Sequence, residues 1–421
     1  MTRVNRCRVL AVMGSGETSP TMVTVHRALA GRLTARPPAA VLLDTPYAFQ
    51  ENAADVSARA RAYFARSVGL DVAAPGDAAP GGGPAAVRSA DWAFSGPGSP
   101  SYALGRWRGD GTAQALRDRV AARPGVTVMA SAAAATIGCA ALPVYEIYKA
   151  GAAPHWLEGL DLLASCGLRV AVIPHYDNAE GGTHDTRYCY LGERRLTVLE
   201  RELPSGAAVL GVDEHTAVIV DLDAGQVQVA GRGTVTVRRA GHSTVLPSGT
   251  EISLAELRDL VRHGPAALTA RPAAGGPAAG SPPDSPGPAP ASATLTELTA
   301  AAAQAFDAAA AAGDAQAMVS AILDLEQAVT DWSADTEEDQ GPAQSRAVLR
   351  GLISRLGEFA AAAGGPAEAL TAVAGPLLAV RSELRARGLF QAADTIRDTL
   401  VEAGLQVRDT ADGPRWTLRR P

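Results

Sequence analysis

The chain has 421 residues, more than one ordinary domain needs, and 47% of them are hydrophobic, enough to form buried cores. Its formal net charge of −6 argues against a protein that coats nucleic acid by bulk positive charge, although a local basic patch stays open. The four cysteines form no CxxC pair, which argues against both a zinc knuckle and a disulfide framework.

The N-terminus and the apolar runs bear on localisation. The opening segment, MTRVNRCRVLAVMGSGE, has too short an apolar core for a signal peptide and is predicted to contain a first strand. The apolar runs stay below the ~18 residues that a membrane span requires. We therefore expect a cytoplasmic protein that is not attached to a membrane.

One compositional break divides the chain. Residues 264–292 read GPAALTARPAAGGPAAGSPPDSPGPAPAS, which is rich in Pro, Ala, Gly and Ser. Such a segment buries too little apolar surface to offset its ordering entropy, so it is predicted to be a flexible linker. It separates a predicted domain at 1–263 from a second one at 293–421.

Strand and helix patterns alternate in the first domain. Short apolar runs predict buried strands at 8–14, 39–46, 91–96, 126–131 and 168–174. Amphipathic helices are predicted between them, as at 52–69 and 111–123. This alternation predicts an α/β fold with a parallel, doubly wound sheet, whose functional residues gather where strands end. After Gly206, strands without helices predict an antiparallel addition at one edge: 207–213, 216–222, 226–231 and 234–239.

The second domain shows helical periodicity and no strand pattern until its last residues. Its helices are predicted at 294–313, 314–334, 344–364 and, as one continuous stretch, 375–405. The fold class is therefore α/β, followed by a separate all-α bundle of about four helices.

Three polar residues stand at predicted strand ends. Ser131 follows a buried strand and precedes a helix, which is the setting of a nucleophile elbow. His175 could act as its general base, and Glu214 could orient the imidazole. Each residue also has a structural interpretation: a serine that ends a strand, a loop histidine and an exposed turn acid.

A glycine turn accompanies these residues. Gly96 and Gly98 follow a predicted strand, and glycine there lets backbone N–H groups face a site without a Cβ in the way. The N–H groups of Gly98 and Ala132 would then form an oxyanion hole.

Taken together, the motifs resemble the cyanophycinase and aspartyl dipeptidase family of serine peptidases, on a class I glutamine amidotransferase-like fold. The resemblance covers roughly residues 6–240 and rests on four segments: GPGS at 96–99, MASAAA at 129–134, IPHY at 173–176 and GVDEHTA at 211–217. It implies that Ser131 is the nucleophile, His175 the base and Glu214 its orienter. Met129 and Ala133 replace both elbow glycines of the family. The alternative that the chain is a catalytically inactive binding protein with the same fold therefore stays open.

The family's arginine-bearing substrate segment is replaced by DNAEGGTHDTRYCYLGERRL at 177–196. Arginines there could hold a carboxylate or phosphate, or could pair with surface acids such as Asp185. We expect the substrate-binding residues to be Gly96, Asp177, Asn178, His184, Arg187 and Arg194. The histidines and aspartates of this segment fit no metal-ligand spacing, so no metal and no cofactor are expected.

The end of the chain resembles the C-terminal helical domain of cysteinyl-tRNA synthetase. The similarity is dense over residues 377–416 and rests on Arg381, Arg385, Phe390, Ala393, Asp394, Ile396, Arg397, Asp398, Leu400, Gly404, Asp409, Thr410, Gly413 and Trp416. The synthetase's nucleotide-binding signatures and zinc-binding cysteines have no counterpart here, so aminoacylation is not expected. RNA binding would use Arg381, Arg385 and Arg387, whereas salt bridges within a solvated helical hairpin are the alternative.

The sequence thus predicts a serine hydrolase-like protein that cleaves an amide or ester in a small, peptide-like or aminoacyl substrate. Its second domain would dock tRNA or, alternatively, a protein partner. The oligomeric state stays open.

Overall fold

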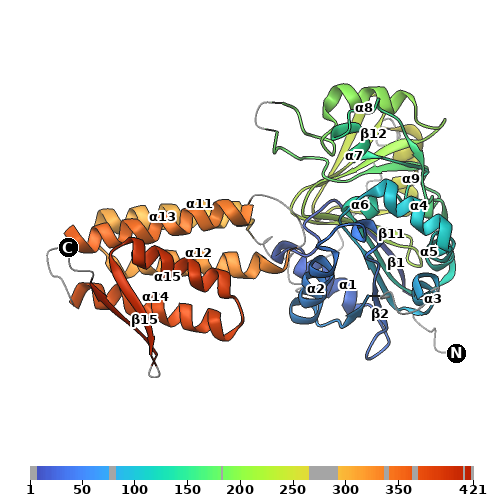
Figure 1. Cartoon of the computed structure of the whole chain (residues 1–421). Helices are drawn as coiled ribbons and strands as arrows, with labels where there is room; N and C mark the ends of the chain where they lie inside the picture. Colours follow the sequence, from blue (N-terminus) through green and yellow to red (C-terminus); the bar gives the residue numbers. More distant parts are fainter. Residues whose placement is uncertain are drawn as a thin grey trace, which may run out of the picture. The chain divides into compact units, whose positions relative to one another are not determined.

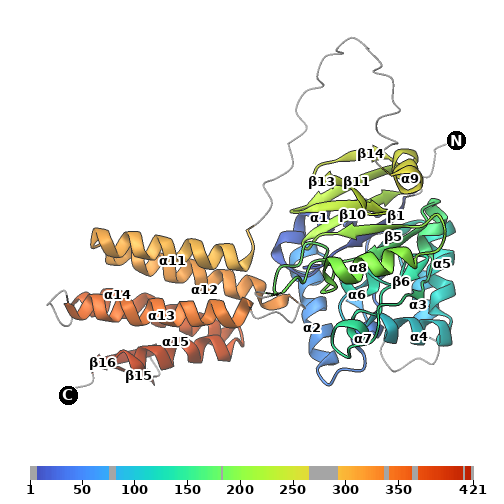
Figure 2. The same cartoon turned by 90° about the horizontal axis from the view of Figure 1, so that it is seen from above.

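The computed structural model describes residues 7–74, 82–181, 184–264, 293–335, 341–362, 368–410 and 413–418. The chain forms two compact units, Met1–Ser292 with Ala334–Glu337 and Ala293–Ser333 with Glu338–Pro421 (Figures 1 and 2). The predicted linker lies outside the described residues except for Gly264, which ends α9 (Leu254–His263). Within the described ranges, every helix is too short or too polar to span a bilayer.

The first unit is built around an eight-stranded sheet in the order β14-β11-β10-β1-β5-β4-β2-β3. Five of its strands run parallel: β1 (Arg8–Met13), β5 (Gly125–Ala130), β4 (Trp92–Ser95), β2 (Ala40–Leu42) and β3 (Val72–Ala73). Three antiparallel strands extend the sheet beyond β1: β10 (Thr216–Asp221), β11 (Gln226–Gly231) and β14 (Glu251–Ser253). The α/β class is confirmed, and so is the antiparallel edge addition for the strands predicted at 216–222 and 226–231. The prediction is wrong for 207–213 and 234–239, which lie in a second sheet, where the first of them runs parallel to one of its neighbours.

Strands β1, β5, β4, β2 and β10 are buried on both faces, which explains why their sequences are almost continuously apolar. Strand β11 instead alternates buried and more exposed residues. On β1, Met13 points into one core and Val12 into the other. One core receives α1 (Val23–Gly31) and α2 (Ala53–Tyr63). The opposite core receives α3 (Gly82–Ser89), α4 (Pro100–Asp110) and α5 (Thr112–Ala122).

A second, six-stranded sheet has the order β13-β12-β9-β8-β6-β7. Its central strands, β8 (Val170–Ile173) and β9 (Ala208–Val212), are parallel. The others are β12 (Thr234–Arg239), β13 (His242–Pro247), β6 (Ala140–Ala141) and β7 (Leu157–Glu158). The sequence pattern does not distinguish the two sheets. The chain changes sheet in the turn after β9, where His215 has a φ of 51°, and β10 then pairs with β1.

In the described part of the second unit, five α-helices are followed by a hairpin. The helices are α11 (Leu295–Ala312), α12 (Ala315–Asp331), α13 (Gly341–Ala362), α14 (Glu368–Ala386) and α15 (Phe390–Glu402), and the hairpin joins β15 (Leu405–Thr410) to β16 (Gly413–Leu418). The single helix predicted at 375–405 is wrong. Gly388 adopts a φ of 76°, a conformation that costs glycine little, and it separates α14 from α15.

The hairpin is joined to α14 by an ion pair. The side chain of Arg381 is only 1% exposed, and its two terminal nitrogens donate to the Asp409 carboxylate at 2.6 and 3.0 Å. These hydrogen bonds hold the pKa of Asp409 below its usual value. The expectation that Arg381 contacts RNA is therefore wrong, because its guanidinium is buried and already bound. Arg385 and Arg387 stay about half exposed, each 3.8 Å from a carboxylate.

We predict that Asp409→Ala destabilises the helical unit by ~1–3 kcal/mol, because it leaves a buried guanidinium without its partner. The cost stays below that of a fully buried pair, since Asp409 itself is 56% exposed. This loss of unfolding free energy is measured by urea unfolding of the full chain, with hydrogen exchange in α14 and β15 as the readout. The matched control is Asp398→Ala, which removes an exposed partner of Arg397 and should cost less than ~0.5 kcal/mol. Equal effects of the two variants would contradict the prediction.

Candidate active site

The predicted site residues gather where parallel strands end. Ser131 follows β5, and Gly96 follows its neighbour β4, so the two positions share one edge of the first sheet. His175 comes two residues after β8, and Glu214 two residues after the neighbouring β9. The strand ends of the two sheets meet at this point.

Ser131, His175 and Glu214 form a chain of hydrogen bonds. The Ser131 Oγ lies 3.0 Å from His175 Nε2, and His175 Nδ1 lies 2.9 Å from Glu214 Oε1. Burial alone would raise the pKa of Glu214, but hydrogen bonds from His175 and Asn178, with the His175 charge, give a net lowering. Glu214 is thus ionised near neutral pH. It can hold the imidazole with Nδ1 protonated and Nε2 facing the serine.

The backbone of Ser131 has the geometry of an elbow. Its φ is 46°, in the left-handed region that non-glycine residues enter at a cost. The family's elbow glycines are not needed for this turn. Met129 packs into the core beneath the sheet, and the Ala133 N–H donates to the Gly96 carbonyl at 3.1 Å. Both replacements therefore fit the site.

The glycine turn is tied to the rest of the unit at Gly98. A Cβ there would lie 2.2 Å from the Pro46 carbonyl oxygen, and its φ is 126°, so only glycine fits. Ala132 is the second residue of α6 (Ser131–Ala134), in the first turn of a helix, where N–H groups have no intrahelical acceptor. The Ala133–Gly96 hydrogen bond holds these two segments side by side.

Asp177 and Asn178, expected to bind substrate, contact Glu214 instead. The buried Asn178 amide donates to Glu214 Oε1 at 3.0 Å, and Asp177 Oδ1 accepts the Glu214 N–H at 2.8 Å. Burial raises the pKa of Asp177 to about 6. Both residues therefore fix the position of the carboxylate that holds His175.

Of the remaining predicted substrate residues, Gly96 is buried, whereas His184, Arg187 and Arg194 are exposed. His184 and Arg194 face solvent, and Arg194 lies on α8 (Gly192–Arg201). The Arg187 guanidinium donates to both Asp185 oxygens, at 2.8 and 2.9 Å, which lowers the pKa of Asp185. For Arg187, the alternative of a surface ion pair is the one that the structure shows.

Aromatic residues of the same segment, which sequence reasoning missed, lie beside the histidine. Tyr188, Cys189 and Tyr190 have φ values of 61°, 56° and 62°, and the Cys189 N–H donates to the His175 carbonyl at 3.0 Å. The Tyr190 ring centre lies 6.4 Å from that of His175, and the ring stacks on Tyr148 at 5.0 Å. Local sequence carries no signal for three successive left-handed residues.

A second missed residue is Glu17, which follows β1 in the segment MGSGETSP and is fully buried. Its only sequence signal is its place after a strand, at the edge where Ser131 also lies. In the part of the chain that the structure describes, no group of three or more His, Cys, Asp or Glu side chains is arranged to hold a metal ion.

Comparisons with known proteins give two kinds of similarity, and no protein-family model matches the chain. In sequence, the chain matches cysteine–tRNA ligases over short segments. The identity is 56% over 43 residues for the protein of Pseudarthrobacter chlorophenolicus and 38% over 73 residues for that of Chlorobaculum tepidum. These segments cover 10% and 17% of this chain, which in turn spans only 9% and 15% of the relatives' length.

In structure, the chain is similar to a peptidase from an acI-B1 actinobacterium, with a TM-score of 0.44 and 18% identity over 59% of this chain and 98% of that one. A putative peptidase E protein from Listeria monocytogenes aligns with a TM-score of 0.36 and 14% identity, over 53% of this chain and 98% of that one. The chain is thus similar to peptidase structures over somewhat more than half its length, and to cysteine–tRNA ligases over short segments.

Proposed function

We propose that the first unit is a serine hydrolase that cleaves an amide or ester bond in a peptide-like or aminoacyl substrate. The observation that carries this proposal is the hydrogen-bond chain from Ser131 through His175 to Glu214, with Ser131 held in a left-handed conformation. Strained backbone and a nucleophile–base–orienter arrangement occur together at sites of nucleophilic catalysis.

The residues would act in two similar steps. His175 Nε2 takes the Oγ proton as Ser131 attacks the carbonyl carbon, and the π electrons move onto the carbonyl oxygen. The N–H groups of Ala132 and Gly98 stabilise that oxyanion. As it collapses, the bond to the amine or alcohol breaks, and the leaving group receives the proton from His175. Water then attacks the acyl-enzyme in the same way and releases the acid.

A serine-directed fluorophosphonate should form a covalent adduct on Ser131, detected by mass spectrometry of the intact protein and its peptides. Ser131→Ala should abolish the adduct, and His175→Ala should slow its formation by ~10³-fold or more, because the base is lost. Ser101→Ala is the control, because the Ser101 hydroxyl on α4 contacts Ser99 and Glu146 and takes no part in the hydrogen bonds to His175. A folded wild-type protein without an adduct would favour the alternative, a binding protein that keeps the fold without catalysis.

Glu214→Gln should lower the labelling rate on the order of 10²–10⁴-fold, because an amide no longer stabilises the imidazolium or fixes its tautomer. Asn178→Ala should have a smaller effect in the same direction, since it removes one of the hydrogen bonds that hold Glu214. Glu158→Gln removes an exposed carboxylate of β7 and serves as the control. If Glu214→Gln is labelled at the wild-type rate, Glu214 has no role in activating Ser131 through His175.

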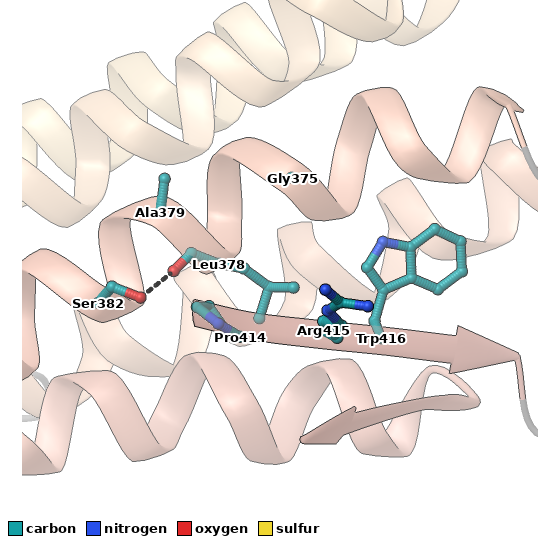
Figure 3. A pocket seen from close by; sticks show the side chains of 7 residues that line it. All are labelled: Gly375, Leu378, Ala379, Ser382, Pro414, Arg415 and Trp416. Carbon is teal, nitrogen blue, oxygen red and sulfur yellow. Dashed lines mark hydrogen bonds between the residues drawn. The ribbon is translucent and has the colours of Figure 1, made fainter. Parts of the chain in front are cut away.

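For the second unit we propose tRNA binding, supported by the matches to cysteine–tRNA ligases. A pocket of about 450 Å³ lies between α14 and β16. Figure 3 shows the Trp416 indole and the Arg415 guanidinium on β16, with Pro414 and Leu378 nearby. An aromatic ring and an arginine side by side suit an unstacked base and its phosphate. A protein partner is the alternative occupant.

A gel-shift series with total tRNA at two ionic strengths distinguishes these two partners. RNA binding through Arg385, Arg387 and Arg415 should weaken steeply as salt rises, because phosphate contacts release counterions. Trp416→Ala should also weaken binding, whereas Arg355→Ala, at an exposed ion pair with Asp307, should have little effect. If no shifted species forms even at low salt, the RNA proposal fails.

A further inference from the structure

Glu17 is a buried acid that the proposed chemistry leaves unused. Its side chain is 0% exposed, and within the described residues neither carboxylate oxygen has a hydrogen-bond partner in another residue. Burying an unpaired carboxyl group is costly, and buried polar groups are almost always hydrogen-bonded. An exception of this kind at the edge of a candidate active site points to a functional role.

The topology places Glu17 at the same edge of the sheet as the nucleophile. Glu17 lies four residues beyond the end of β1, and Gly96 directly follows β4. A Cβ on Gly96 would lie 2.6 Å from Glu17 Oε1, so the carboxyl group packs against that glycine. Strand β5 lies between β1 and β4 in the sheet. The Glu17 carboxyl group therefore reaches the turn after β4, whose Gly96 carbonyl accepts the N–H of Ala133, two residues after Ser131.

The charged and titratable groups around Glu17 come from several elements. Burial raises the pKa of Glu17 to about 7, its own backbone N–H and His175 oppose the rise, and Asp335 adds to it. Tyr47 and Tyr63 also interact electrostatically with Glu17, and their own pKa values are raised, chiefly by burial. The phenols are thus neutral near pH 7. His175 and Asp335 are the groups whose charge acts on Glu17.

We propose that the charge state of Glu17 controls the electrostatic field at the hydrolase site and that Glu17 must be uncharged for turnover. The inference rests on the proposed function, because it concerns the oxyanion formed beside Ala132 and Gly98. When the carboxyl group beside Gly96 is neutral, the Ala132 and Gly98 N–H groups make the largest contribution to the electrostatic field at the oxyanion. An ionised Glu17 places a negative charge beside the position where negative charge develops, and this raises the barrier.

The test is the pH dependence of Ser131 labelling by the fluorophosphonate between pH 5 and 9. In the wild type, the rate should rise as His175 loses its proton, then fall at least fivefold as Glu17 ionises. Glu17→Gln, which has the same shape and no charge to gain, should keep the acid limb and lose the alkaline fall. Glu17→Met provides a second uncharged variant of similar size, and Glu158→Gln is the control that should keep the wild-type profile. The same alkaline fall in Glu17→Gln and Glu17→Met would overturn the inference.

A second measurement does not depend on labelling. The infrared difference spectrum between wild type and Glu17→Gln at pH 6 should contain the C=O stretch of a protonated carboxyl group, and its absence would overturn the inference. If Ser131 is labelled and the Glu17 variants have the same pH profile as the wild type, only the role of Glu17 is disproved. If Ser131 is not labelled in any variant, both the proposed hydrolase function and the inference about Glu17 are disproved.

Discussion

The 3.0 Å contact between Ser131 and His175 is the constraint around which the first unit is arranged, because it joins residues from two different sheets. The serine ends a strand of the eight-stranded sheet, and the histidine follows a strand of the six-stranded one. Glu214 lies in the turn where the chain passes from one sheet to the other. The two sheets must therefore keep their mutual position to within a few tenths of an ångström for the hydrogen bonds to persist. One buried core contains residues of both sheets, among them Val12 of β1 and Val172 of β8, and it provides that rigidity.

Sequence alone located the residues whose position follows from a strand end. Ser131, His175 and Glu214 each stand after an apolar run, and parallel strands bring such positions to one edge. The contacts of Asp177 and Asn178 with Glu214 could not be predicted from the sequence, because they depend on how two loops pack against each other. Glu17 was missed since burial of a single acid leaves no periodic pattern. Split sheets and left-handed turns are likewise set by contacts distant in sequence.

The helical unit shows how one residue type takes different roles. The sequence left RNA contacts and salt bridges open as roles for Arg381, Arg385 and Arg387. In the structure Arg381 is buried against Asp409, while Arg385 on α14 and Arg387 in the turn after it remain near solvent. Helical periodicity tells which residues share a face, but Asp409 of the hairpin, which binds Arg381 on that face, lies 28 residues further along the chain. A buried guanidinium bound at both terminal nitrogens fixes the hairpin against the helix.

The turn at Tyr188–Tyr190 has a consequence for how this site can diversify. Main-chain hydrogen bonds from Tyr188 and Cys189 join it to the segment that carries His175, and these bonds involve no atom of the aromatic rings. A left-handed conformation in three successive residues costs about 1–2 kcal/mol each, and glycine or asparagine there would relieve it. Exchange of the tyrosine side chains would thus reshape the wall beside the imidazole while leaving the imidazole in place. The tyrosine side chains beside the site can therefore change independently of the His175 imidazole.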